Sequence, residues 1–263
     1  NLEIVIHNHN LLDYYISKKK KLNIHIKFNA GMNRYGFHPN EVKNIVSKLK
    51  ENDFLKVKSI CSHLSSSNDL QKKDITQKQI ILFEKIASDF ESKLGRKTDK
   101  HILNSNGFIN YPQYQFNMVR LGIALFGCFP DRNLFPISTF VSVISENRDI
   151  NAGDSVGYSS SFISKEKMNI SVIPVGYADG LNRRLGNNIG SVLISNSLCP
   201  IIGNISMDSF MVDTSKVECK VGDKVEIFGQ QNTVLNLSKK LNTIPYEIYS
   251  TLNRRIKRVY LDN

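Results

Sequence analysis

The sequence has no run of apolar residues long enough to cross a membrane, which takes about 18, and so no membrane partner is expected. It also lacks a basic segment followed by an apolar one at its start, the pattern of a secretory signal peptide. The chain does not start with methionine. We therefore expect it to begin inside a longer protein.

Cysteine is scarce, and its positions exclude two kinds of site. The four cysteines stand at 61, 128, 199 and 219, and no two have the CxxC spacing of a zinc or dithiol redox site. We therefore predict no metal site. Scattered, reduced cysteines are typical of a cytoplasmic protein, which is the localisation we expect.

Nucleic-acid signatures are absent, although the formal net charge is +11. A basic balance can indicate a nucleic acid or an anionic ligand as partner. The lysines are dispersed apart from Lys18–Lys21, which is predicted to be the exposed end of a helix, where cations are favoured. No RNP-like, helix-turn-helix or zinc-finger string occurs. Nucleic-acid binding is therefore the weakest alternative.

The first half of the chain alternates apolar strands with amphipathic helices. One helix opens after Pro39–Asn40, and another is predicted to begin at the capping-box pair Thr76 and Gln79 and to end at Gly95. Strands are predicted at residues 2–6, 22–28, 57–61, 101–105 and 118–126. This alternation is typical of a parallel α/β sheet.

From about residue 136 the predicted strands are short and separated by turn sequences such as Asn151–Asp154 and Val221–Asp223. This spacing predicts a mainly antiparallel β domain with one helix, over 233–241. The predicted domains are residues 1–133 and 134–263. Because a complete (β/α)₈ barrel needs about 250 residues, the first domain is either an open sheet or part of a barrel.

Several specific motifs follow one another along the chain. In order, they are His25–Phe37 (HxKxDTGMxRxG), Ser62–Asp69 (THFxxAD), Asn104–Ser105 (NS), Met118–Gly127 (MVRxGIxxYG), Val156–Ser159 (VxYG), Gly176–Gly180 (GYADG), Gly203–Asp208 (GRxxMDQ) and Tyr246–Arg255 (YE…RxxR). Together they resemble the C-terminal two-thirds of the alanine racemases, fold-type III enzymes that use pyridoxal 5'-phosphate (PLP).

The resemblance implies about the last five strands of a PLP-binding TIM-type (β/α)₈ barrel, followed by the β domain. It also implies a homodimer whose subunits share each active site, with alanine as the small-molecule substrate. The implied reaction interconverts L- and D-alanine to supply peptidoglycan precursors. PLP withdraws electrons from the substrate, and two opposed acid–base groups then exchange the proton.

The resemblance also gives roles to single residues. Tyr158 matches the tyrosine base, which the partner subunit supplies. His63 and Arg120 match a hydrogen-bonded pair beside it, and Arg120 faces the pyridine nitrogen of PLP. Since guanidinium only donates, that nitrogen must accept and the ring stays neutral. Without the surrounding motif, a packed aromatic on a strand would be the favoured interpretation of Tyr158.

Further residues match binding positions of the family. Arg34 matches a contact to the PLP phenolic oxygen and the substrate carboxylate. Lys27 matches a lysine that is often carbamylated, or else is a plain charged strand residue. Ser105 matches the phosphate cup, together with the backbone N–H groups of Gly122 and Ile123. Tyr177, Met207 and Asp208 match the substrate entrance, although Met207 also suits a core position.

The chain departs from the family pattern in places. No KxNAYGHG string, which carries the PLP lysine of the family, occurs here. We therefore expect the N-terminal segment to be absent and the chain to be inactive by itself. Other departures are Asn29–Ala30 for Asp-Thr, Ser206 for Cys, Asn204 for Arg, and Arg254 near a position that is tyrosine in some members.

Two alternatives to an alanine racemase stay open. The first is a related PLP racemase acting on serine, lysine or a broad set of amino acids. The second is a non-catalytic remnant that keeps the β domain as a binding module.

Overall fold

The computed structural model describes residues 2–129 and 134–261. The chain divides into two compact units, residues 1–122 and 123–263, and each is described by itself. The predicted domain boundary, between residues 133 and 134, adjoins a segment outside the described residues. It stays a prediction.

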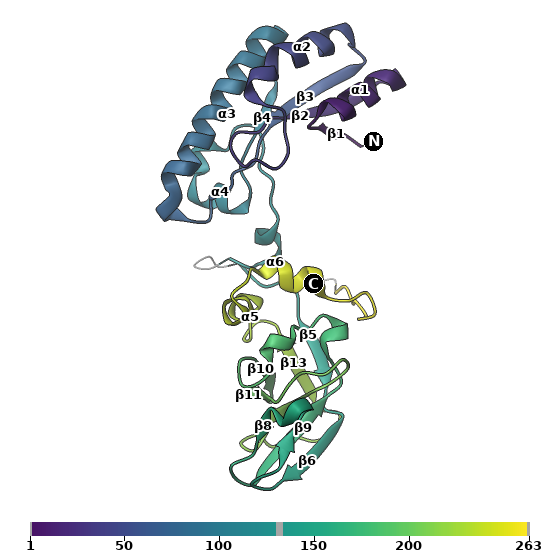
Figure 1. Cartoon of the computed structure of the whole chain (residues 1–263), viewed down its shortest axis with the longest axis vertical. Coiled ribbons are helices and arrows are strands. Elements are labelled where there is room, and N and C mark those ends of the chain that lie inside the picture. The colour runs from purple at the N-terminus through teal and green to yellow at the C-terminus, as the bar shows by residue number, and fades with distance from the viewer. Residues whose placement is uncertain (1, 130–133, 262–263) are drawn as a thin grey trace. The chain divides into compact units, whose positions relative to one another are not determined.

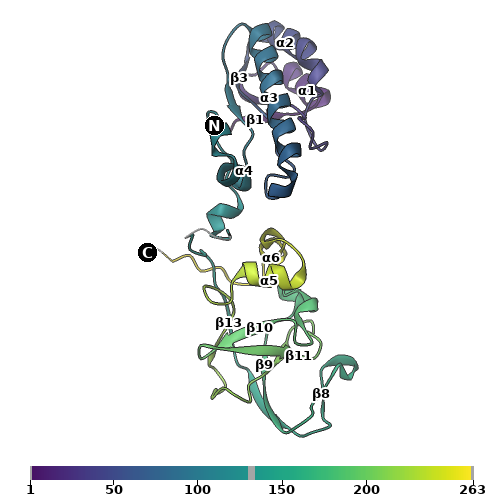
Figure 2. The ribbon, with the colours of Figure 1, turned by 90° about the vertical axis from the view of Figure 1, so that its left-hand side faces the viewer.

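Unit 1 is a layer of parallel strands with helices between them. Among its described residues, β1 (Ile4–Ile6), β2 (Leu22–Lys27), β3 (Leu55–Cys61) and β4 (Asp99–His101) pair in parallel in that order. The helices are α1 (His9–Lys18), α2 (Val42–Glu51), α3 (Lys73–Leu94) and α4 (Ser105–Asn110), with 3₁₀ turns at Pro39–Glu41, Leu70–Lys72 and Pro112–Tyr114. Figure 2 shows α1, α2 and α3 grouped on one side of the strands. This confirms the predicted α/β alternation.

The two faces of this sheet differ in polarity, because successive side chains of a strand point to opposite faces. Ile24 and Ile26 of β2 are fully buried in the apolar core that includes α2 and α3. His25 and Lys27, which alternate with them, are only partly buried. The second face of the sheet therefore carries the polar side chains.

Helix ends follow the sequence closely in two places. Helix α1 ends at Lys18 and Lys19 takes a left-handed conformation, and Gly95 does the same after α3. The predicted capping box is wrong, since Thr76 and Gln79 lie buried inside α3, which begins at Lys73. Gln79 instead accepts hydrogen bonds from the backbone and hydroxyl of Ser65, both at 2.9 Å.

The predicted fifth strand, 118–126, is not a strand. The Arg120 N–H donates to the Leu103 carbonyl at 3.0 Å, but no ladder continues it, and Ile123–Phe126 is a 3₁₀ turn. The fourth strand also ends earlier than predicted. Asn104 caps α4 by accepting from the Gly107 N–H at 2.8 Å, so the helix begins at Ser105.

Unit 2 is mainly antiparallel β, as predicted. Across residues 134–261, the strands of the main sheet pair in the order β5-β13-β10-β11-β12-β9-β6, every pair antiparallel. They are β5 (Phe140–Val143), β6 (Glu146–Ile150), β9 (Met168–Ile173), β10 (Ser191–Ile194), β11 (Ser197–Ile202), β12 (Phe210–Asp213) and β13 (Lys224–Phe228); β7 (Ser155–Val156) pairs with β8 (Phe162–Ile163). Figure 1 shows these strands with α5 and α6 at one end of the sheet.

Two helices, rather than the single predicted one, belong to the described part of unit 2. Helix α5 (Val234–Leu241) has Thr233 as its cap, as expected, and buries Leu237 and Leu241 in the core of the sheet. Helix α6 (Pro245–Thr251) was not predicted. Proline at the first helical position is its one local signal.

Candidate active site

The carboxyl ends of the parallel strands bring several candidate residues together in unit 1. Lys27 is the last residue of β2, His63 follows the end of β3 by two residues, and His101 ends β4. These ends meet at one edge of the sheet, where ligands bind in α/β folds. Sequence reasoning did not single out His101, because the predicted strand, 101–105, placed this residue at the start of the strand, whereas β4 ends there.

Arg120 reaches into this edge and donates only to neutral acceptors. Its guanidinium donates to the Ser62 carbonyl at 2.6 Å, to Nδ1 of His63 at 3.2 Å and to Nδ1 of His101. No carboxylate forms an ion pair with it among the described residues. The predicted His63–Arg120 pair is thus present in the structure.

Both imidazoles beside Arg120 are held neutral. Burial, and then the Arg120 charge, lowers the pKa of His63 to about 4. Burial, and again Arg120, lowers the pKa of His101 to about 3. A neutral imidazole that accepts at Nδ1 carries its proton on Nε2. Each ring can therefore donate from Nε2 while it holds Arg120.

Lys27 lies beside the same group of charges. Burial lowers the pKa of its amine, Cys61 raises it and Arg120 and Arg34 lower it further. Its ammonium also lies 5.8 Å from the centroid of the Tyr35 ring. Arg34 is exposed, and its charge also lowers the pKa of His63. The four predicted residues Lys27, Arg34, His63 and Arg120 are therefore electrostatically connected.

The residues predicted to bind the phosphate take part in hydrogen bonds between backbone N–H groups and side-chain hydroxyls. In unit 1, the Gly122 N–H donates to Oγ of the buried Ser105 at 2.8 Å. In unit 2, the Ile123 N–H donates to the Tyr246 hydroxyl at 2.6 Å. Hydroxyls and backbone N–H groups suit a phosphate, so these residues fit the phosphate of PLP. Tyr246 was quoted in a motif but not predicted to act here.

Tyr158 lies in a turn of unit 2 and not on a strand, so its reading as a packed strand aromatic is wrong. It begins the 3₁₀ turn Tyr158–Ser160, in which Ser159 and Ser160 have φ of 60° and 45°. Asn204 Nδ2 donates to its carbonyl at 3.0 Å. The Tyr158 side chain is 70% exposed, so its phenol is accessible from outside the chain.

Two loops of unit 2 hold Tyr177 and Met207 side by side. The Tyr177 N–H donates to the Ser206 carbonyl and the Ala178 N–H to the Met207 carbonyl, each at 3.1 Å. A Cβ on Gly176 would lie 2.1 Å from the Met207 carbonyl oxygen, so only glycine permits this approach. Met207 is 53% exposed and is therefore not a core residue.

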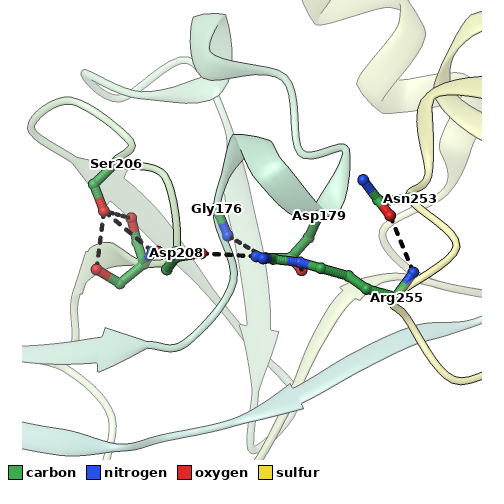
Figure 3. Close-up of polar contacts among 7 residues, drawn as sticks. Gly176, Asp179, Ser206, Asp208, Asn253 and Arg255 are labelled. Carbon is green, nitrogen blue, oxygen red and sulfur yellow. Dashed lines mark hydrogen bonds and ion pairs between the residues drawn. The ribbon is translucent and has the colours of Figure 1, made fainter.

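Arg255 connects these loops to the C-terminal segment (Figure 3). Its guanidinium donates to Asp179 at 2.6 Å and to Asp208 at 2.8 Å, while its backbone N–H donates to Asn253 at 3.0 Å. The Arg255 hydrogen bond lowers the pKa of Asp179, whose second oxygen accepts from Gly176. Sequence reasoning predicted Asp208 but missed Asp179 and Arg255, although both stand inside quoted motifs.

The described residues offer no alternative centre based on a metal. No group of three or more His, Cys, Asp or Glu side chains in residues 2–129 and 134–261 could hold a metal ion. The cysteines are free thiols. In the same ranges, no helix is long and apolar enough to span a membrane.

Models of two known domain families match the chain. The model of the alanine racemase N-terminal domain matches residues 1–130, and that of the C-terminal domain matches residues 137–260. The chain belongs to the alanine racemase family. Alanine racemase 2 of Caldanaerobacter subterraneus subsp. tengcongensis is 34% identical, covering 93% of this chain and 66% of the relative. The alanine racemase of Vesicomyosocius okutanii is 32% identical, covering 97% and 72%.

Solved structures agree with this assignment. The alanine racemase of Bartonella henselae with covalently bound pyridoxal phosphate is similar at a TM-score of 0.87 and 29% identity, over 98% of this chain and 72% of that one. The Bacillus anthracis alanine racemase with bound L-Ala-P has a TM-score of 0.89 and 25% identity, over 99% and 71%. Unit 1 thus has the barrel-type α/β fold of this family, and unit 2 has its β fold.

One expectation from the sequence is overturned here. We expected the N-terminal segment of the family to be absent, but the N-terminal domain model matches residues 1–130. That expectation is therefore wrong. The chain spans 66% of the length of the Caldanaerobacter relative.

Proposed function

We propose that the protein is a PLP-dependent racemase that interconverts L- and D-alanine in the cytoplasm and supplies D-alanine for peptidoglycan. The observation that carries the proposal is the Arg120 guanidinium, which lies at the carboxyl ends of β3 and β4 among neutral acceptors. Membership of the alanine racemase family supports it.

Bound PLP supplies the electron withdrawal that makes the Cα hydrogen of an amino acid acidic. Arg120 donates to the pyridine nitrogen and, because it cannot accept, keeps that nitrogen unprotonated. Ser105, Gly122 and Ile123 bind the phosphate. Arg34 binds the phenolic oxygen of PLP and the substrate carboxylate. Guanidinium and backbone N–H groups only donate and the Ser105 hydroxyl can also donate, so these residues suit the acceptor oxygens and nitrogen of PLP.

Tyr158 is proposed as the base on one face of the substrate. Its exposed phenol, 70% accessible, is free to reach the site of a second subunit, which supports a homodimer with shared sites. His63 accepts from Arg120 at Nδ1 and so can donate Nε2–H to the Tyr158 oxygen, which stabilises the deprotonated phenol. A lysine is the second base of the family mechanism, and the KxNAYGHG string that carries it does not occur in the sequence.

Lys27 is proposed to be carbamylated. Carbamylation requires a neutral amine, and burial together with Arg120 and Arg34 lowers the pKa of Lys27. The resulting anion would be attracted to both cations and would orient Arg34. Tyr177, Met207 and Asp208, which the paired loops of unit 2 expose, are proposed to line the substrate entrance.

A coupled D-alanine assay tests the proposed function. The protein expressed from its complete open reading frame is incubated with L-alanine and PLP, beside serine and lysine as competing substrates. We expect D-alanine to form fastest. Preference for another amino acid would assign a different racemase, and no product with PLP bound would indicate a non-catalytic remnant. The same assay on the 263-residue chain tests the prediction that it is inactive by itself.

A further inference from the structure

A chain of hydrogen bonds crosses the polar face of the unit 1 sheet. It begins at Arg120, which donates to Nδ1 of His101 on β4. Nε2 of His101 lies 2.9 Å from Oγ of Ser59 on β3, and that oxygen lies 2.6 Å from Nδ1 of His25 on β2. Nε2 of His25 lies 2.8 Å from a carboxylate oxygen of Glu3, just before β1. Arg120 is thereby connected to a carboxylate across the whole sheet.

One assignment of donors and acceptors satisfies every link. A guanidinium only donates, so His101 must accept at Nδ1 and, being neutral, carry its proton on Nε2. His101 therefore donates to Ser59, and the Ser59 hydroxyl is left to donate to Nδ1 of His25. His25 then carries its proton on Nε2 and donates to Glu3. Each hydrogen bond in this series then pairs one donor with one acceptor.

The inner members of this hydrogen-bond chain are shielded from solvent. Ser59 is 0% exposed and His101 is 4% exposed. Loss of the Ser59 hydroxyl would leave an imidazole N–H unpaired on one side and an imidazole acceptor unpaired on the other, which is costly in a buried place. Glu3 lies at the exposed end and accepts a second hydrogen bond from Asn23 at 3.1 Å. The carboxylate is therefore itself held in place.

We propose that Glu3, His25 and Ser59 are positioning residues that fix the Nε2–H tautomer of His101 and thereby hold the guanidinium of Arg120. Without these hydrogen bonds, His101 is free to carry its proton on Nδ1. In that tautomer, Nδ1 cannot accept a hydrogen bond from Arg120. The consequence for catalysis, an oriented Arg120 at the pyridine nitrogen, rests on the proposed function. The tautomer itself is a property of the protein without cofactor.

The protonation of His101 agrees with this arrangement. Burial and the Arg120 charge lower the pKa of His101 to about 3, so the ring is neutral at pH 7. A protonated ring would donate from both nitrogens and would repel Arg120. What remains to be fixed is therefore which nitrogen carries the proton, and the Ser59 oxygen on the Nε2 side does this.

Nitrogen NMR of the histidine rings tests the proposal directly, because the two tautomers have distinct ¹⁵N shifts at Nδ1 and Nε2. The protein is labelled only in histidine, of which it has six, and is measured at pH 7 without cofactor. We expect single Nε2–H tautomers for His101 and His25. A His101 ring protonated at Nδ1, or an even mixture of tautomers, overturns the proposal.

Single substitutions remove individual hydrogen bonds from this series. Ser59→Ala should convert the His101 signal from a single tautomer to a mixture. Ser59→Thr keeps the hydroxyl and should restore the wild-type signal. Asn23→Ala, which removes the other hydrogen bond to Glu3, is the matched control and should leave His101 unchanged. An unchanged His101 signal in Ser59→Ala overturns the proposal.

Glu3→Gln keeps the test decisive if Ser59→Ala does not fold, since Glu3 lies at the surface. It removes the charge at the end of the chain, and we expect a mixture of tautomers at His25 and a smaller change at His101. No change at either ring would contradict the proposal. These measurements need neither PLP nor alanine, so they stay valid if the racemase assay fails. An active racemase whose His101 has the other tautomer would refute only the positioning role.

Discussion

The two units hold their candidate residues in opposite ways. In unit 1, Arg120 and the imidazoles around it are partly or fully buried and joined by hydrogen bonds. In unit 2, the candidate side chains stand on loops and are exposed, with Tyr158 at 70% and Met207 at 53%. A buried set is organised before any ligand arrives, whereas an exposed set needs a surface to act on. We infer that the buried residues of unit 1 hold the pyridine ring of the cofactor and that Tyr158 of unit 2 acts on another subunit's site.

Removing the phenol hydroxyl of Tyr158 should have the largest effect, and it tests whether an exposed side chain of unit 2 acts in catalysis. Tyr158→Phe should lower racemisation by about 10²–10⁴-fold, the usual contribution of a general acid–base group. PLP binding, followed by absorbance, should not change, because the side chain belongs to unit 2. Tyr260→Phe, at a tyrosine that is also exposed, at 90%, is the control. An unchanged kcat in Tyr158→Phe would contradict the assignment.

Changing Arg120 should instead alter the cofactor's chemistry. Arg120→Glu replaces a donor with a carboxylate, which accepts a hydrogen bond and would stabilise a protonated pyridine nitrogen, so the ring would become a stronger electron sink. We expect a changed cofactor absorption spectrum and the appearance of pyruvate through transamination. Pyruvate is measured with lactate dehydrogenase. A spectrum like the wild type, without pyruvate, would show that Arg120 does not face that nitrogen.

The buried imidazoles predict how the stability of unit 1 depends on pH. The pKa of His63 falls from 6.5 to about 4 on folding, so the unfolded state takes up a proton first as the pH drops. Stability is therefore unaffected above pH 6.5 and decreases between pH 6.5 and about 4, by up to about 3 kcal/mol. Urea unfolding at several pH values measures this.

His63→Gln cannot be protonated and should reduce that loss, whereas His38→Gln, at an exposed histidine, should keep it. An equally steep decrease in wild type and His63→Gln would mean that other groups cause it.

The smallest effect is expected where unit 2 brings two loops together. In Gly176→Ala the new Cβ meets the Met207 carbonyl oxygen, and overpacking of this kind costs about 1–3 kcal/mol. We expect a lower unfolding midpoint and a raised KM for alanine, with PLP affinity unchanged. Gly153→Ala is the matched control, since no atom lies near its Cβ position, although its φ of +92° adds a strain of its own. Unchanged KM would remove these loops from the substrate entrance.

The sequence predicted the elements with strong local signals. Apolar alternation located β2 and β3, and Gly95 located the end of α3. The prediction for 118–126 failed because the apolar residues of this segment resemble a strand, while only the Arg120 N–H donates to the Leu103 carbonyl before the backbone turns. Helix α6 failed because Pro245 is a weak signal by itself.

The candidate residues were predictable from motifs, but their connections were not. Arg120 and His63 were paired in advance, whereas His101 and Ser59 lie on separate strands and Glu3 precedes a third, with no motif linking them. Their contact depends on the register of parallel pairing, which sequence periodicity does not fix. Arg255 was missed for the same reason, since its partners lie in loops far away in the sequence.

The central claim, that the protein exchanges the Cα hydrogen of alanine with the help of PLP, can be tested in deuterated water. The protein from its complete open reading frame is incubated with L-alanine and PLP, and the alanine is followed by proton NMR and chiral analysis. The account predicts D-alanine that carries deuterium at Cα, and slower exchange in Tyr158→Phe. Alanine that keeps both its Cα proton and its L configuration, with PLP bound, would contradict it.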